Sequence, residues 1–88
     1  MEIRYRTSFG RDLRRERNSD LRRRVERIVE QLQSAPSVAS VPSVAGMRGY
    51  ANHYRIRVGD YRLGIVVDGD TAILVRLLHR RDIYRHFP

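Results

Sequence analysis

The chain has 88 residues, too few for more than one sizeable hydrophobic core, so two-domain and large-barrel enzymes are excluded and we expect one domain, residues 1–88. All eighteen basic residues are arginine, and against ten acidic residues they give a formal net charge of +8, which indicates a polyanionic partner. The absence of cysteine excludes disulfides, a thiolate nucleophile and cysteine-bound zinc. The apolar runs are too short to span a bilayer, so we expect a cytoplasmic protein without membrane contact.

The first half of the chain predicts one strand and two helices. Residues 2 to 7 alternate apolar and charged side chains, as a half-buried strand does. Phe9 and Leu13 then predict a short helix that ends at Asn18. A second helix should begin after the Asn18-Ser19-Asp20 cap and end before Pro36. Its apolar side chains trace one stripe: Leu21, Val25, Ile28, Val29 and Leu32.

The second half predicts three further strands. Residues 35 to 50 are rich in Pro, Ser and Gly and indicate a loop. Strands are expected at 53–58, 61–67 and 72–78, joined by two hairpin turns, with a short helix or turn in residues 80–88. The predicted fold is α+β: a small twisted four-stranded, mainly antiparallel sheet with two N-terminal helices, in the order β-α-α-β-β-β.

The first hairpin carries the most informative pattern. If Gly59-Asp60 forms a two-residue turn, Arg57 faces Arg62 and Arg55 faces Gly64. Three guanidinium groups then share one face, and opposed like charges cost on the order of 0.2–1 kcal/mol. A phosphate would offset this cost, because guanidinium forks two N–H donors onto phosphate oxygens. We also expect Gly64 to leave room for a ligand. The alternative is that these arginines alternate outward only because the other face is core.

Further basic residues leave two interpretations open. On the helices, acidic residues stand three or four positions from arginines, which predicts a solvated face with short-range ion pairs, while the excess charge could help docking onto RNA. Near the C-terminus, Tyr84 could stack on a base or anchor the tail with Ile83. His79 and His86 could titrate near neutrality, although a lone histidine is more often structural.

These residues together resemble the RelE/ParE superfamily of toxins from toxin–antitoxin systems, and RelE-like messenger-RNA endonucleases in particular. The resemblance covers nearly the whole chain. It is carried by the opening strand and Phe9, the helix that Pro36 ends, the stretch Gly46-Met47-Arg48-Gly49, the hairpin Tyr54 to Leu63, and the closing His79-Arg80-Arg81-Asp82-Ile83-Tyr84.

The resemblance implies a ribosome-dependent ribonuclease that uses no metal or other cofactor and is held inactive by an acidic, partly disordered antitoxin. In such enzymes the RNA 2′-hydroxyl attacks the adjacent phosphate, which leaves a cyclic phosphate and a 5′-hydroxyl. By position, Arg62 matches the phosphate-binding arginine, Arg80 or Arg81 a second arginine, and Tyr84 the C-terminal tyrosine. Other candidates to contact RNA are Arg48, Arg76 and Arg85.

One departure from the family concerns proton transfer. Arg55 and Arg57 stand where the family often has lysine, and arginine is a poor general base because it stays protonated at any working pH. The arginines would then stabilise charge on phosphorus while His79 or ribosomal RNA moves the proton. Two alternatives remain: a ParE-like poison of DNA gyrase, and a catalytically weak toxin homologue that only binds RNA.

Overall fold

The computed structural model describes residues 1–88 and confirms the α+β class with two N-terminal helices. Its elements run in the order β1 (Glu2–Tyr5), α1 (Thr7–Arg15), α2 (Ser19–Ser34), the 3₁₀ turn η1 (Val38–Ser40), β2 (Val44–Gly46), β3 (His53–Val58), β4 (Tyr61–Asp68), β5 (Thr71–His79) and α3 (Ile83–His86). None of the helices combines the length and the hydropathy that a membrane span requires.

The sheet has five strands, so the prediction of four was wrong by one. The additional strand, β2, falls in the segment expected to be a loop and pairs antiparallel with β3, placing Val44 beside Ile56 and Gly46 beside Tyr54. The prolines and serines around this short apolar segment favoured the prediction of a loop. Such a short edge strand depends on its neighbour for its conformation, which a local sequence pattern does not contain.

Two predicted boundaries were too long by two or three residues. β1 ends at Tyr5 and α1 ends at Arg15, where we had expected Thr7 and Asn18. Asn18 instead caps α2: its Oδ1 accepts hydrogen bonds from the backbone N–H groups of Asp20 (2.9 Å) and Leu21 (3.2 Å). The capping role predicted for this cluster is therefore confirmed, and it separates the two helices.

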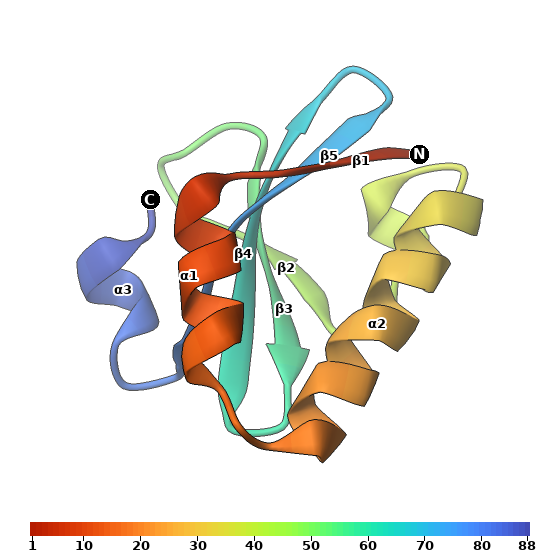
Figure 1. Ribbon diagram of the computed structural model, residues 1–88. Helices are drawn as coiled ribbons and strands as arrows, with labels where there is room; N and C mark the ends of the chain where they lie inside the picture. The colour runs from red at the N-terminus through yellow and green to blue at the C-terminus, as the bar shows by residue number, and fades with distance from the viewer.

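The strands are ordered β1-β5-β4-β3-β2, with β1 parallel to β5 and every other pair antiparallel. Figure 1 shows α1 and α2 on the same side of the twisted sheet. The main core lies between these helices and the sheet, and α2 contributes its predicted stripe: Leu21, Val25, Ile28 and Leu32 are buried, with Val29 partly so. From the strands come Ile56, Val58, Leu63, Ile65, Ala72, Leu74 and Leu77.

A smaller apolar cluster of Met47, Ile83 and Phe87 packs against Val66, Val75 and Leu78. Its Phe87 ring lies directly on Gly64, so that a Cβ on this glycine would come within 2.7 Å of the ring. The expectation that Gly64 leaves space for a ligand was therefore wrong. The chain itself fills that space with its C-terminal segment.

One ion pair joins α1 to the sheet. The buried Asp12 carboxylate accepts hydrogen bonds from Arg76 Nε (2.8 Å), Arg76 Nη2 (3.2 Å) and the backbone N–H of Leu77 (3.0 Å). It is the only ion pair in the structure, so the pairs expected along the helix surfaces do not form. Pairs between exposed long side chains gain little in water.

Replacement of Asp12 by alanine should lower the free energy of unfolding by about 3 kcal/mol, because it leaves the partly buried Arg76 charge and the Leu77 N–H without their partner. Urea denaturation followed by circular dichroism measures this. Asp68→Ala, which removes an exposed acid at the end of β4, is the control and should change stability by no more than ~0.5 kcal/mol. Equal effects of the two substitutions would contradict a structural role for Asp12.

Candidate functional site

A cavity of about 360 Å³ opens over the sheet where β2, β3 and β4 meet α3. Arg55 and Arg57 reach it from β3, Arg62 from β4 and Tyr84 from α3. Ser43, Val44 and Ala45 form its remaining wall. The structure therefore brings together four of the residues that the sequence pointed to, from three separate elements.

Strand register sets this arrangement. Arg57 pairs with Arg62 and Arg55 with Gly64, as predicted from a two-residue turn. The intervening pair, Ile56 with Leu63, is completely buried on the opposite face. The alternation of a half-buried strand thus divides the hairpin into a core face and a guanidinium face.

No carboxylate lies within 4.0 Å of the three cavity arginines. Arg62 is oriented by the backbone, because its Nη1 donates to the carbonyl oxygens of Gly59 (3.0 Å) and Tyr61 (2.9 Å). Arg57 makes no side-chain hydrogen bond, and Arg55 makes only long contacts. Each guanidinium carries five N–H donors, so most of the donors in the cavity are unused and are suited to an anion.

Tyr84 contributes an aromatic surface rather than an anchor. It is 61% exposed, whereas its neighbour Ile83 is completely buried. The guanidinium carbon of Arg55 lies 5.6 Å from the centre of the Tyr84 ring, within the range of a cation–π contact. Ile83 and Phe87 therefore anchor the tail, whereas Tyr84 stays largely exposed beside Arg55.

His79 lies elsewhere. It pairs with Tyr61 at the far end of β5 and packs edge-on against the Tyr61 ring, with centroids 5.5 Å apart. The Tyr61 hydroxyl donates to Glu16 of α1 (3.0 Å), and His79 shares a hollow with Asp12 and Glu16. His79 is thus beside α1 rather than in the arginine cavity, which removes the geometric basis for its expected role in proton transfer.

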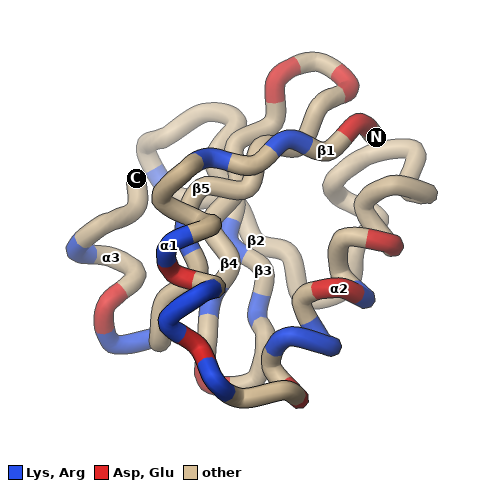
Figure 2. The backbone as a smooth tube through the Cα atoms, viewed as in Figure 1, with Lys and Arg blue, Asp and Glu red and all other residues tan.

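The remaining candidate arginines are dispersed. Arg80 and Arg81, the candidates for a second catalytic arginine, are exposed and do not line the cavity. Of the candidate RNA contacts, Arg48 and Arg85 are also exposed outside the cavity, and Arg76 is engaged by Asp12. The backbone N–H of Arg80 donates to the Asp60 carbonyl (2.8 Å), which joins the end of β5 to the β3–β4 turn. Figure 2 shows acidic positions in the β4–β5 turn, at the other end of the sheet from the β3–β4 turn. Residues Asp68 and Asp70 belong to that acidic end.

Two features of the site were missed from the sequence. Ser43, in the left-handed backbone region (φ 63°), and Ala45 of β2 form a wall that exists only because β2 pairs with β3. Phe87 supports the segment that carries Tyr84, and the four-residue spacing of Ile83 and Phe87 is the signal that could have revealed it.

No group of three or more His, Cys, Asp or Glu side chains is placed to hold a metal ion.

Comparison with known proteins assigns the family to which a chain with this fold and site belongs. Residues 3–84 match the family described as the ParE toxin of the type II toxin–antitoxin system, parDE, and the chain belongs to it. The chain is also similar to Toxin RelE3 of Methanocaldococcus jannaschii, with 40% identity over 89 residues and all of both chains covered. The chain is a type II toxin of the RelE kind.

Solved structures agree with this assignment. The chain resembles a crystal structure of a RelB–RelE antitoxin–toxin complex from Methanococcus jannaschii, with a TM-score of 0.82, 40% identity, and coverage of 97% of this chain and 99% of that chain. It also resembles the toxin–antitoxin complex RelBE2 from Mycobacterium tuberculosis, with a TM-score of 0.62, 26% identity, and coverage of 90% and 96%. The predicted family and fold are confirmed.

Gly64→Ala should loosen the C-terminal segment, because the new Cβ would overlap the Phe87 ring and force it to move. We expect faster amide hydrogen exchange in residues 83–87, while the exchange of β3 and β4 changes little. Gly10→Ala is the matched control, since a Cβ there meets nothing closer than 3.5 Å. Unchanged protection of residues 83–87 in Gly64→Ala would show that Phe87 does not hold this segment.

Tyr61 should make stability depend on alkaline pH. Partial burial raises the pKa of Tyr61 above its ordinary value of 10.0, and the Glu16 carboxylate raises it further. The folded state thus binds the phenolic proton more tightly than the unfolded state. This contribution is complete below about pH 10 and is lost as the pH rises through the folded-state pKa. Urea denaturation at several pH values should show that wild type loses more stability above about pH 10 than Tyr61→Phe does; parallel losses would contradict it.

Proposed function

We propose that this toxin cleaves messenger RNA on the ribosome and so inhibits translation in the cytoplasm. The observation that supports the proposal best is the cavity in which Arg55, Arg57 and Arg62 converge without a carboxylate, beside the exposed Tyr84. Clustered guanidinium groups next to an aromatic face suit a nucleotide, whose phosphate and base need both kinds of contact.

In the proposed reaction, the 2′-oxygen of one nucleotide forms a bond to the adjacent phosphorus, and the bond between phosphorus and the 5′-oxygen breaks. The 2′-hydroxyl loses its proton and the 5′-oxygen gains one, which leaves a cyclic phosphate and a 5′-hydroxyl. Negative charge grows on the phosphate oxygens in the transition state. Preorganised guanidinium donors stabilise that charge, often the largest single contribution to catalysis.

The cavity arginines suit different parts of this task. Arg62 is held in place by the carbonyl oxygens of Gly59 and Tyr61, so it would meet the scissile phosphate with little loss of side-chain entropy. Arg57 has no side-chain partner and would supply a second, adjustable fork of donors. Arg55, which lies over the Tyr84 ring, would contact the phosphate while Tyr84 stacks on a base.

The chain supplies little for proton transfer within the cavity. No histidine or carboxylate lines it, and arginine does not give up its proton. We infer that the group accepting the 2′-proton comes from ribosomal RNA. This would make the ribosome part of the active site and explain how a toxin without lysine could still cut RNA there.

An antitoxin is the second expected partner. The relatives from Methanococcus jannaschii and Mycobacterium tuberculosis were solved as toxin–antitoxin complexes. We propose that a cognate, acidic and partly disordered antitoxin holds this chain inactive. The formal net charge of +8 favours such a partner through long-range attraction.

Arg62→Ala should reduce mRNA cleavage by roughly 10²–10³-fold, the usual effect of removing one donor to a developing oxyanion. New mRNA 5′ ends, mapped after induction in cells and in ribosome-bound cleavage assays, measure the loss. Arg23→Ala, which removes an exposed arginine outside the cavity, should cleave normally. Undiminished cleavage by Arg62→Ala would exclude Arg62 from the site.

The same induction separates the rival functions. A ParE-like poison of DNA gyrase is the first rival. It would produce linear plasmid in a gyrase assay and no new mRNA ends. A protein that only binds RNA would produce neither. Either outcome would contradict the nuclease proposal.

A further inference from the structure

A second hollow adjoins the arginine cavity and is lined mostly by other residues. It has a volume of about 300 Å³ and lies between α2, the segment before β2 and the end of β3. The two spaces share Arg57 and Ser43. Arg24, Arg27 and Gln31 of α2 line its far wall.

The sheet edge is uncovered where the two spaces meet. Pairing between β2 and β3 begins at Val44 and Ile56, and the last backbone hydrogen bond along this edge runs from the Arg57 N–H to the Ser43 carbonyl (3.2 Å). On the side away from β4, the end of β3 and the turn at Gly59 therefore have no neighbouring strand. A chain leaving the arginine cavity can pass around this corner toward α2, with Arg57 beside it in both spaces.

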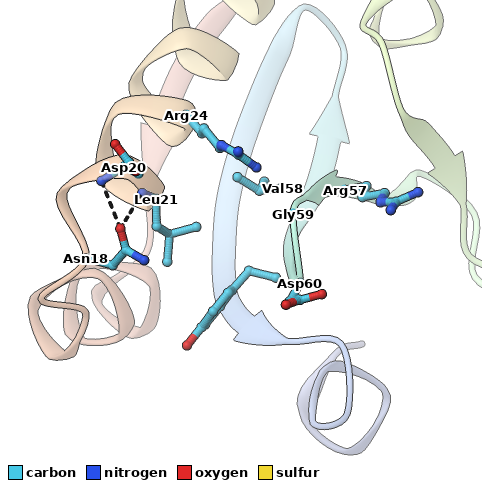
Figure 3. Close-up of a pocket in the computed structure, with 9 residues that line it drawn as sticks. Asn18, Asp20, Leu21, Arg24, Arg57, Val58, Gly59 and Asp60 are labelled. Atoms are coloured by element: carbon cyan, nitrogen blue, oxygen red, sulfur yellow. Dashed lines mark hydrogen bonds between the residues drawn. The ribbon is translucent and has the colours of Figure 1, made fainter.

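Figure 3 shows how the arginines flank this corner: Arg24 points from α2 toward Val58 and Gly59, while Arg57 leaves β3 on the side away from α2. Arg24 lies against the turn, with its Nη1 only 3.0 Å from the position that a Cβ on Gly59 would take. Gly59, with a positive φ of 61°, thus permits both the turn and this approach.

Charges on α2 are segregated. Arg24 and Arg27 face this hollow, whereas Glu26 and Glu30 line a different, largely apolar hollow with Tyr5, Phe9, Leu13, Val25 and Val29. No carboxylate lies within 4.0 Å of Arg24 or Arg27. Arg24 and Arg57 also border a third space, where Asp20 and Asp60 supply the first carboxylates next to these arginines.

We propose that Arg24, Arg27 and Gln31 form a subsite for the phosphates of single-stranded RNA that flank the phosphate held in the arginine cavity. This inference rests on the proposed function and extends it: the RNA would run from Tyr84 and Arg62, around the edge at Arg57, onto α2. Arginine contacts along a backbone give affinity without reading sequence, so the subsite sets the length of RNA that is gripped.

The test measures binding of the full chain to uncleavable 2′-O-methyl RNA of three and seven nucleotides by fluorescence anisotropy at several salt concentrations. Wild type should bind the longer RNA more tightly. Arg24→Gln/Arg27→Gln should lose most of that gain and keep its affinity for the trinucleotide. For the longer RNA, a plot of the logarithm of the association constant against the logarithm of salt concentration should have a slope that is smaller in magnitude by about 1.4 than in wild type. This difference corresponds to two lost phosphate contacts at ~0.7 each.

Arg14→Gln/Arg23→Gln removes the same charge from exposed helix positions outside both spaces and should retain the length-dependent gain. Equal losses in the two double variants, or equal losses for both RNA lengths, would overturn the subsite. Arg62→Gln separates this inference from the proposed function, because it should weaken even the trinucleotide. If Arg62→Gln binds both RNAs normally, or wild type binds neither, RNA binding by the arginine cavity is itself contradicted.

Discussion

The register of the β3–β4 hairpin is the constraint on which the rest of the molecule depends. A slip of one residue would move Arg55 and Arg57 into the core and turn Ile56 and Val58 out to solvent. The turn at Gly59 and Asp60 prevents this slip, since Gly59 adopts the positive φ that a two-residue hairpin turn needs. The hydrophobic core and the guanidinium cavity are therefore fixed by the same pairing, on opposite faces.

The arginines of this protein fall into two groups, which differ in whether a carboxylate binds the guanidinium group. Arg76 is bound by the buried Asp12 and joins α1 to β5, so its charge is satisfied within the fold. Arg55, Arg57 and Arg62 have no carboxylate partner and retain donors for a ligand. The difference lies in the partner rather than in the residue type. Apolar burial on the other face offsets the repulsion among the three.

The sequence predicts those features that depend on residues close together in the chain. The stripe from Leu21 to Leu32, the Asn18 cap and the Arg57–Arg62 pairing follow from periodicity and turn chemistry, and the structure confirms each. Features that depend on distant pairing were missed or misplaced. Strand β2 exists through β3, and Arg76 meets an acid 64 positions away. No local pattern contains such contacts.

The same limit applies to the site. Tyr84 is a candidate through the family resemblance, but the contact of Phe87 with Gly64 that holds its segment over the sheet is not contained in the local pattern. His79 was a candidate for proton transfer because arginine is a poor base, whereas strand register places it against Tyr61 beside α1. The neighbours of a side chain on a sheet are set by pairing across strands, and so proximity in sequence misleads.

The charged side chains that line the cavity are all arginine, without histidine or carboxylate, so pH and salt affect its positive potential differently. Its positive potential stays constant across the range in which cells vary their acidity, since guanidinium remains charged throughout. Dissolved ions still act on it, because the range of unshielded attraction shrinks from about 10 Å at 0.1 M to about 3 Å at 1 M ionic strength. Ionic strength, rather than proton concentration, is thus the variable that changes the attraction of this surface for an anion.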